Sequence, residues 1–220
     1  MTNLITNQRN YKNKMNGKFI VFEGIDGAGK TTQVNILAER LRAEGKKVVI
    51  TAEPTGLEGG KRLREALSGK IKKSECEMAV MFVADRIEHN IHKTEGISAL
   101  VESGAYVICD RYYYSTLAYQ GQSTDYEWVK KMNLSCPEIR RPDLCIYLDL
   151  TPEQSLERIS RGRESVEIYE NLETLTKVRN TFLSVIDDLT CEGDRIAKIN
   201  AYGTVEEIAE KVYSALANVK

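Results

Sequence analysis

A short glycine-rich segment, residues 24–31, constrains this chain more than any other part of its sequence. It reads Gly-Ile-Asp-Gly-Ala-Gly-Lys-Thr and matches the pattern GxxxxGK[ST]. The apolar run KFIVFE precedes it, and a segment with apolar residues at helical spacing follows it. In that context glycines allow backbone N–H groups to converge on phosphate oxygens at a helix N-terminus. The pattern therefore predicts a phosphate-binding loop between a buried strand and a helix over residues 30–43.

Apolar segments typical of buried strands alternate with helical segments along the chain. We expect strands at residues 18–24, 47–51, 105–110, 144–150 and 195–200. We expect further helices at residues 61–67, 74–101, 114–121, 126–134, about 168–190 and 204–219, and one that begins at residue 152. This alternation predicts an α/β fold with a five-stranded parallel sheet and helices on both of its faces. Such sheets bind ligands beyond the carboxyl ends of their strands, so the loops that follow these strands should face one cleft.

Length and charge limit the organisation of the chain and its partners. The chain has 220 residues, 31 basic and 32 acidic, and this near-neutral balance argues against nucleic-acid binding through bulk charge. We expect a mobile N-terminal tail over residues 1–16 and a single domain over 17–220, with a small lid at about 158–170. No apolar stretch approaches the roughly 20 residues of a membrane-spanning helix, and we expect no membrane partner. Five cysteines without a CxxC pair are typical of reduced thiols, which favours a cytoplasmic protein.

Four side chains around the predicted loop suit phosphate chemistry. Lys30 can reach terminal phosphates, and the hydroxyl of Thr31 can bind Mg²⁺. Asp110 ends the apolar strand VICD, where it can hold the same metal ion, and Arg111 follows with a guanidinium suited to bidentate phosphate contact. Asp149, at the end of CIYLD, is a second candidate for the metal role.

The loop alone does not distinguish an ATPase, a GTPase and a kinase. An NKxD element that would read guanine is absent from the sequence. Phe82 and Arg86 are four residues apart and share a helix face, where a ring and a cation would suit a planar base. Taken alone, this pair, like Tyr119, is also compatible with ordinary packing and a solvated arginine. A nucleoside monophosphate kinase and a P-loop ATPase switch coupled to a partner protein both remain open on these residues.

Two histidines and two cysteines have ordinary interpretations. His89 and His92 lie one helical turn apart, but no third metal ligand is evident, and we interpret both as surface residues. Cys109 and Cys145 lie within apolar strands and are expected in the core.

Six segments of the chain occur in an order and spacing that resemble the thymidylate kinase family. They are FEGIDGAGKTTQ, EP, FVADR, DRYYYSTLAYQG, PDLCIYLDL and RGR. These P-loop nucleoside monophosphate kinases transfer the γ-phosphate of ATP to dTMP with Mg²⁺. The resemblance covers about residues 18–215. It favours phosphorylation of dTMP over that of uridylate or cytidylate, and over a partner-coupled ATPase.

The resemblance implies a role for each matching residue. The donor phosphates of ATP would be held by Gly24, Ile25, Asp26, Gly27, Ala28, Gly29, Lys30, Thr31 and Thr32. Asp26 would also face the sugar of dTMP and help organise Mg²⁺ with Thr31 and Asp110. Arg111 would clamp the acceptor phosphate. The remaining acceptor contacts would come from Glu53, Phe82 stacking on thymine, Arg86 at the base edge, and Ser115, Thr116 and Tyr119.

The resemblance also implies where the catalytic arginines lie. Some members of the family have an arginine within the phosphate loop, at the position that is Gly27 here. Members that lack it supply arginines from the lid, where this chain has Arg158, Arg161 and Arg163. A closing lid can bring such cations to the transferred phosphoryl group after both substrates bind. The family further implies a homodimer, for which Met78, Val80 and Ile91 offer apolar interface residues.

Overall fold

Five parallel strands form the centre of the molecule. The computed structural model describes residues 17–162 and 172–219. The strands are β1 (Lys18–Glu23), β2 (Val48–Ala52), β3 (Tyr106–Asp110), β4 (Leu144–Asp149) and β5 (Ile196–Asn200). They lie in the order β2-β3-β1-β4-β5, and every neighbouring pair is parallel. The predicted five-stranded parallel sheet is confirmed.

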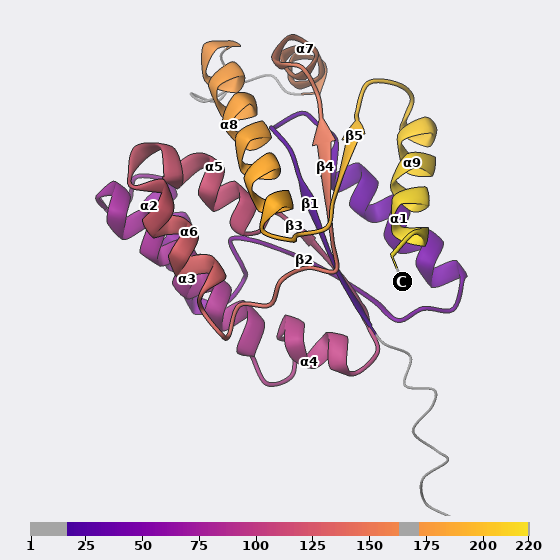
Figure 1. Ribbon diagram of the computed structural model, residues 1–220, viewed down its shortest axis with the longest axis horizontal. Helices are drawn as coiled ribbons and strands as arrows, with labels where there is room; N and C mark the ends of the chain where they lie inside the picture. The colour runs from indigo at the N-terminus through magenta and orange to yellow at the C-terminus, as the bar shows by residue number, and fades with distance from the viewer. Residues whose placement is uncertain (1–16, 163–171, 220) are drawn as a thin grey trace, which may run out of the picture.

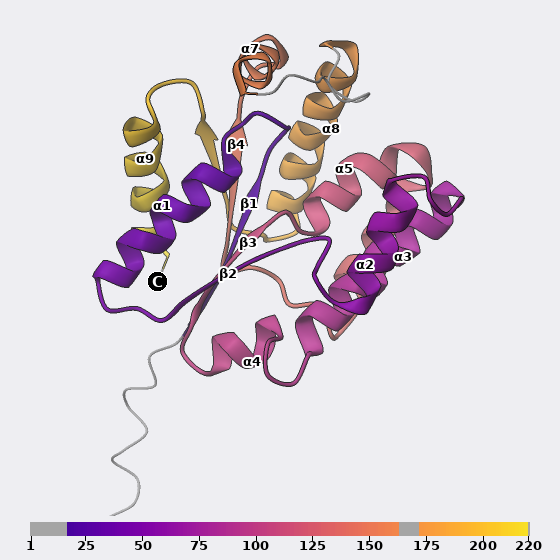
Figure 2. The same ribbon diagram turned by 180° about the vertical axis from the view of Figure 1, so that it is seen from behind.

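Helices cover both faces of this sheet, as Figures 1 and 2 show from opposite sides. They are α1 (Lys30–Ala43), α2 (Glu58–Leu67), α3 (Glu75–Ile91), α4 (Ile97–Glu102), α5 (Tyr113–Ser123), α6 (Tyr126–Leu134), α7 (Pro152–Gly162), α8 (Leu172–Cys191) and α9 (Val205–Ala217). Helices α1 and α9 pack together on one face, whereas α3, α4, α5 and α8 contribute to the core on the other. None of the helices in the described ranges combines the length and apolar character needed to cross a bilayer.

Alternate residues of the strands supply two separate cores. Phe19 and Val21 face the α3–α5–α8 side, whereas Ile20 and Phe22 face the α1–α9 side, and all four are fully buried. Full burial of each such side chain stabilises the fold by about 1.5–3 kcal/mol. A strand buried on both faces needs apolar residues at every position, which explains the continuous apolar runs in the sequence. Cys109 and Cys145 are completely buried, as expected.

One predicted helix is wrong in its extent. The segment 74–101 contains two helices, because α3 ends at Ile91 and His92 takes an extended conformation with φ −54° and ψ 128°. The chain then turns closely at Gly96, where an added Cβ would lie 2.7 Å from the backbone nitrogen of His92. The predicted tail, residues 1–16, and most of the predicted lid lie outside the described residues.

Candidate active site

The loop between β1 and α1 has the backbone that its glycines predict. Gly24, Gly27 and Gly29 have φ values of 146°, 76° and 91°, which side chains rarely permit. A Cβ on Gly24 would lie 2.6 Å from the carbonyl oxygen of Leu148. α1 begins at Lys30, so the loop delivers the amides of a helix N-terminus to the carboxyl edge of the sheet.

α7 packs directly over Gly27. A Cβ there would lie 2.9 Å from the carbonyl oxygen of Ser155 and 3.1 Å from Cγ1 of Ile159. The hydroxyl of Ser155 donates to the carbonyl oxygen of Asp26 at 2.5 Å and ties helix to loop. An arginine at position 27 is therefore incompatible with this placement of α7.

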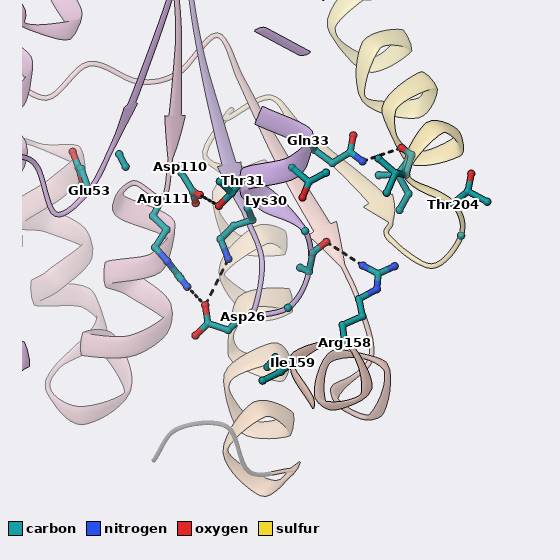
Figure 3. Close-up of a pocket in the computed structure, with 18 residues that line it drawn as sticks. Asp26, Lys30, Thr31, Gln33, Glu53, Asp110, Arg111, Arg158, Ile159 and Thr204 are labelled. Carbon is teal, nitrogen blue, oxygen red and sulfur yellow. Dashed lines mark hydrogen bonds and ion pairs between the residues drawn. The ribbon is translucent and has the colours of Figure 1, made fainter. Parts of the chain in front are cut away.

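A cavity of about 870 Å³ opens in front of the loop. Its volume lies within the roughly 300–1,000 Å³ of typical ligand sites. Three further parts of the fold complete its walls: the ends of β2 and β3, α7, and the turn from β5 to α9 (Figure 3). The lining residues are Asp26, Gly27, Ala28, Gly29, Lys30, Thr31, Thr32, Gln33, Ala52, Glu53, Asp110, Arg111, Arg158, Ile159, Gly203, Thr204, Val205 and Ile208. The residues that follow β1, β2, β3 and β5 thus share one cleft, as the sequence predicts, whereas Leu150 and Thr151, which directly follow β4, are not part of its lining.

Lys30 is buried at the base of this cavity, where two carbonyl oxygens and one carboxylate surround its ammonium. Its Nζ donates to the carbonyl oxygens of Gly24 at 3.0 Å and Ile25 at 3.2 Å, and it lies 3.8 Å from Asp26 Oδ1. Burial, together with the positive charge of Arg111, lowers the pKa of Lys30 to about 8. Asp26, Asp110 and Glu23 oppose this shift, and the negative charge of a phosphate beside the ammonium would favour the charged form further.

Arg111 meets Asp26 on the opposite wall. Its guanidinium hydrogen-bonds the Asp26 carboxylate and donates to Ser115 Oγ at 3.2 Å. Figure 3 shows Asp26 between the ends of Lys30 and Arg111. The Asp26 side chain is 49% exposed, so it bridges the two cations at the mouth of the cavity.

Asp110 and Thr31 form a pair suited to a divalent cation. Thr31 Oγ1 donates to Asp110 Oδ2 at 3.1 Å. Asp110 Oδ1 is buried and has no hydrogen-bond partner among the described residues. Unpaired buried carboxylate oxygen is costly, and oxygen ligands are what Mg²⁺ prefers, so the two residues fit that ion. Asp149, the second candidate, instead pairs with Arg179 at 2.8 Å and Lys198 at 3.4 Å and does not line the cavity.

The residues predicted to bind the acceptor base lie beside the cavity, on α3 and α5. Arg86 is 1% exposed and donates to Glu53 Oε2 at 2.5 Å, Asn133 Oδ1 at 2.5 Å and Thr116 Oγ1 at 3.1 Å. Its Nε has no partner among the described residues. Phe82 is half-buried. Of the predicted acceptor residues, those that line the cavity itself are Asp26, Glu53 and Arg111.

His89 belongs to this network, and its interpretation as a surface residue is wrong. Its side chain is buried, with Nδ1 3.0 Å from Glu53 Oε1 and Nε2 2.8 Å from Thr51 Oγ1. The sequence spacing of His89 shows which helix it occupies but not that β2 lies against it. No group of three potential metal ligands surrounds either histidine in the described part of the chain.

Glu23 was not recognised from the sequence as a site residue. It is fully buried at the end of β1 and accepts hydrogen bonds from the N–H groups of Tyr112 and Ser115 and from the Ser115 hydroxyl. Burial raises its pKa to about 7, although Arg111 and Lys30 oppose this shift. A glutamate within an otherwise apolar strand was the available signal.

The arginines predicted for the lid are described in part. Arg158, on α7, donates to the carbonyl oxygen of Ala201 at 2.7 Å and lines the cavity. The side chain of Arg161 and the whole of Arg163 lie outside the described residues. A phosphate-binding loop, a buried lysine, a Thr–Asp pair and an arginine at one edge of a parallel sheet define a P-loop enzyme that binds nucleotide phosphates.

Comparisons with known proteins identify the family. A family profile described as "Thymidylate kinase" matches residues 22–212. The chain belongs to the thymidylate kinase family, and it is therefore an enzyme, a kinase. It is 39% identical to a probable thymidylate kinase of Pyrococcus abyssi, across 90% of this chain and 95% of the relative. It is 40% identical to a probable thymidylate kinase of Methanococcus aeolicus, across 92% of this chain and 97% of the relative. It is also 40% identical to the thymidylate kinase of Caldicellulosiruptor saccharolyticus, across 90% of this chain and 95% of the relative.

Proposed function

We propose that the protein transfers the γ-phosphate of ATP to dTMP, giving dTDP and ADP. The observation that supports this most strongly is the pairing of two cations across one cavity. Lys30 comes from the phosphate loop, Arg111 comes from the opposite strand end, and Asp26 bridges them. Two anionic substrates meeting between these walls would each find a positive charge. The membership of the chain in the thymidylate kinase family specifies the acceptor.

The donor half of the reaction relies on the loop. Backbone amides of residues 24–32 would bind the β- and γ-phosphates, and Lys30 would neutralise charge on the oxygens of the transferred group. Asp110 and Thr31 would hold Mg²⁺. The support for this is Asp110 Oδ1, which has no hydrogen-bond partner within residues 17–162 and 172–219. When bound, the ion neutralises phosphate charge and aligns the oxygens.

The acceptor half requires position rather than a base. The phosphate oxygen of dTMP is already a nucleophile, so holding it in line can supply part of the roughly 7–11 kcal/mol available from pre-orientation. Arg111 would clamp this phosphate, and Asp26 would turn toward the sugar hydroxyl. Phe82 would stack on thymine, with Ser115, Thr116 and Tyr119 completing the pocket.

Arg86 would distinguish thymine from cytosine. Its N–H groups donate to a carbonyl oxygen but repel the amino group that cytosine has at the same ring position. The buried Nε of Arg86, which has no hydrogen-bond partner among the described residues, supports this assignment. Glu53, which His89 contacts through Nδ1, would then hold the guanidinium in place.

We further infer that Arg161 and Arg163 supply transition-state charge from a lid at about residues 158–170 of a single domain. The closeness of α7 to Gly27 supports this arrangement, because it excludes an arginine from the loop itself. A homodimer through α3 is supported by Val80 and Ile91, which are 47% and 50% exposed, beside Met78. The nucleotide substrates and five free cysteines favour a cytoplasmic location.

An assay of ADP release tests the proposal. The purified protein is given ATP and Mg²⁺ with dTMP, dUMP, UMP, CMP or AMP as acceptor. We expect dTMP to give the highest kcat/KM, ahead of dUMP by about 10- to 200-fold, which is the value of one methyl group in an apolar pocket. ADP release that is unchanged by every acceptor would refute a monophosphate kinase, and a preference for CMP or UMP would refute the assignment of dTMP.

A further inference from the structure

The left-handed backbone of Arg111 is an unusual feature of the cavity wall. Its φ is 70°, and it is the one residue other than glycine with a positive φ in the described part of the chain. This conformation is unfavourable for a residue with a side chain and persists only where neighbouring groups impose it. Arg111 N–H donates to the carbonyl oxygen of Phe22 at 2.9 Å, and Cys109 Sγ lies 3.0 Å from the Arg111 carbonyl oxygen.

Glu23 supplies the contacts that hold the chain immediately after Arg111. Its Oε1 accepts from Tyr112 N–H at 2.8 Å and from Ser115 N–H at 3.1 Å, and its Oε2 accepts from the Ser115 hydroxyl at 2.7 Å. The same Ser115 Oγ accepts from Arg111 Nη1 at 3.2 Å. One carboxylate therefore constrains both the backbone of the turn and, through Ser115, the guanidinium.

We propose that Glu23 is a positioning residue that directs Arg111 toward the acceptor phosphate. This inference rests on the proposed function. Glu23 is fully buried and touches no part of the cavity, so it acts only through Arg111 and the first turn of α5. Its negative charge also lies near the two cations, Lys30 and Arg111, that the substrates must later engage.

The experiment compares Glu23→Gln with a matched change at Asp194. Asp194 is also a buried carboxylate beside α5. It accepts from the hydroxyls of Tyr113 at 2.6 Å and Tyr114 at 2.8 Å and from Arg141 Nη1 at 2.8 Å, and its hydrogen bonds within the described part of the chain do not involve Arg111. We expect Glu23→Gln to lower kcat/KM for dTMP by at least about tenfold while KM for ATP stays within about twofold. Asp194→Asn should lower Tm but leave both KM values within about twofold of wild type. An equal rise in both KM values for Glu23→Gln, or an unchanged kcat/KM for dTMP, would overturn the inference.

A double-mutant cycle tests whether Glu23 acts through Arg111. If it does, adding Glu23→Gln to Arg111→Ala should change kcat/KM by less than about twofold, because the guanidinium it positions is already gone. Multiplicative effects would contradict the proposal. Glu23→Asp keeps the charge but shortens the side chain, and it should show the same selective loss if Glu23→Gln does not fold. Failure of the wild-type protein to phosphorylate dTMP would instead refute the proposed function.

Discussion

Binding of ATP should take up a proton at alkaline pH, because Lys30 has a low pKa in the free protein. Burial and the nearby charge of Arg111 lower this pKa from 10.5 to about 8. At 1.36 kcal/mol per pKa unit, the shift corresponds to about 3 kcal/mol against the charged form. A bound triphosphate places negative charge beside the ammonium and removes most of this penalty.

The size of the effect follows from the pKa. At pH 9, one unit above the pKa of about 8, roughly nine in ten free molecules would have neutral Lys30. ATP binding should then take up about 0.9 proton per site, and the apparent Kd should be about tenfold weaker than at pH 7. Glu23 titrates near pH 7, so a measurement at pH 9 isolates Lys30.

Isothermal titration calorimetry measures this uptake directly. Mg²⁺-ATP is titrated into the protein without dTMP, at pH 9, in two buffers of different ionisation enthalpy. The difference in observed heat gives the number of protons taken up, and Lys30→Met supplies the control because it has no group that titrates there. The same heat in both buffers for the wild type, or equal uptake in Lys30→Met, would refute the reasoning.

Three further predictions concern other residues. Arg111→Ala should lower kcat by more than about 10²-fold with an unchanged circular dichroism spectrum, because preorganised charge is lost; near-normal turnover would exclude its role. As pH rises from 4.5 to 7, the free energy of unfolding of the wild type should fall by about 3 kcal/mol relative to that of Glu23→Gln, because native Glu23 retains a proton that the unfolded chain releases. Urea titrations at both pH values measure this difference. The same change with pH in both proteins would contradict the burial of that charge. Arg86→Met should lower the free energy of unfolding by about 3–5 kcal/mol, because it leaves Glu53 buried without its charged partner. Arg40→Met breaks a surface ion pair with Glu210 and should cost less than about 1 kcal/mol in the same urea experiment.

The sequence predicts those parts of the molecule that depend on local pattern. Apolar runs gave the five strands to within one or two residues, and the glycine-rich loop gave the start of α1 at Lys30. Thr151 and Pro152 predicted the start of α7, and Thr151 Oγ1 does accept from the N–H of Gln154. Because parallel strands share one carboxyl edge, the sequence also predicts that Asp110 and Arg111 lie at the same edge of the sheet as the loop.

Contacts between distant segments could not be predicted in this way. Glu23 and Ser115 are 92 residues apart, and neither has a local pattern that shows the other as its partner. His89 has an ordinary helical spacing. Its two ring nitrogens nevertheless contact Thr51 on β2 and Glu53, the residue directly after β2. Long-range polar contacts within a core depend on the packing of whole elements, which a single sequence does not specify.

The bridge that Asp26 makes between Lys30 and Arg111 has a consequence for unwanted ligands. Asp26 already neutralises part of the charge of both cations, so a single phosphate ion must displace this carboxylate to bind one of them. A molecule, or a pair of molecules, whose phosphates reach both cations at once gains twice for the same displacement. The bridge therefore favours ligands whose phosphates reach both Lys30 and Arg111 over small anions that reach only one of them.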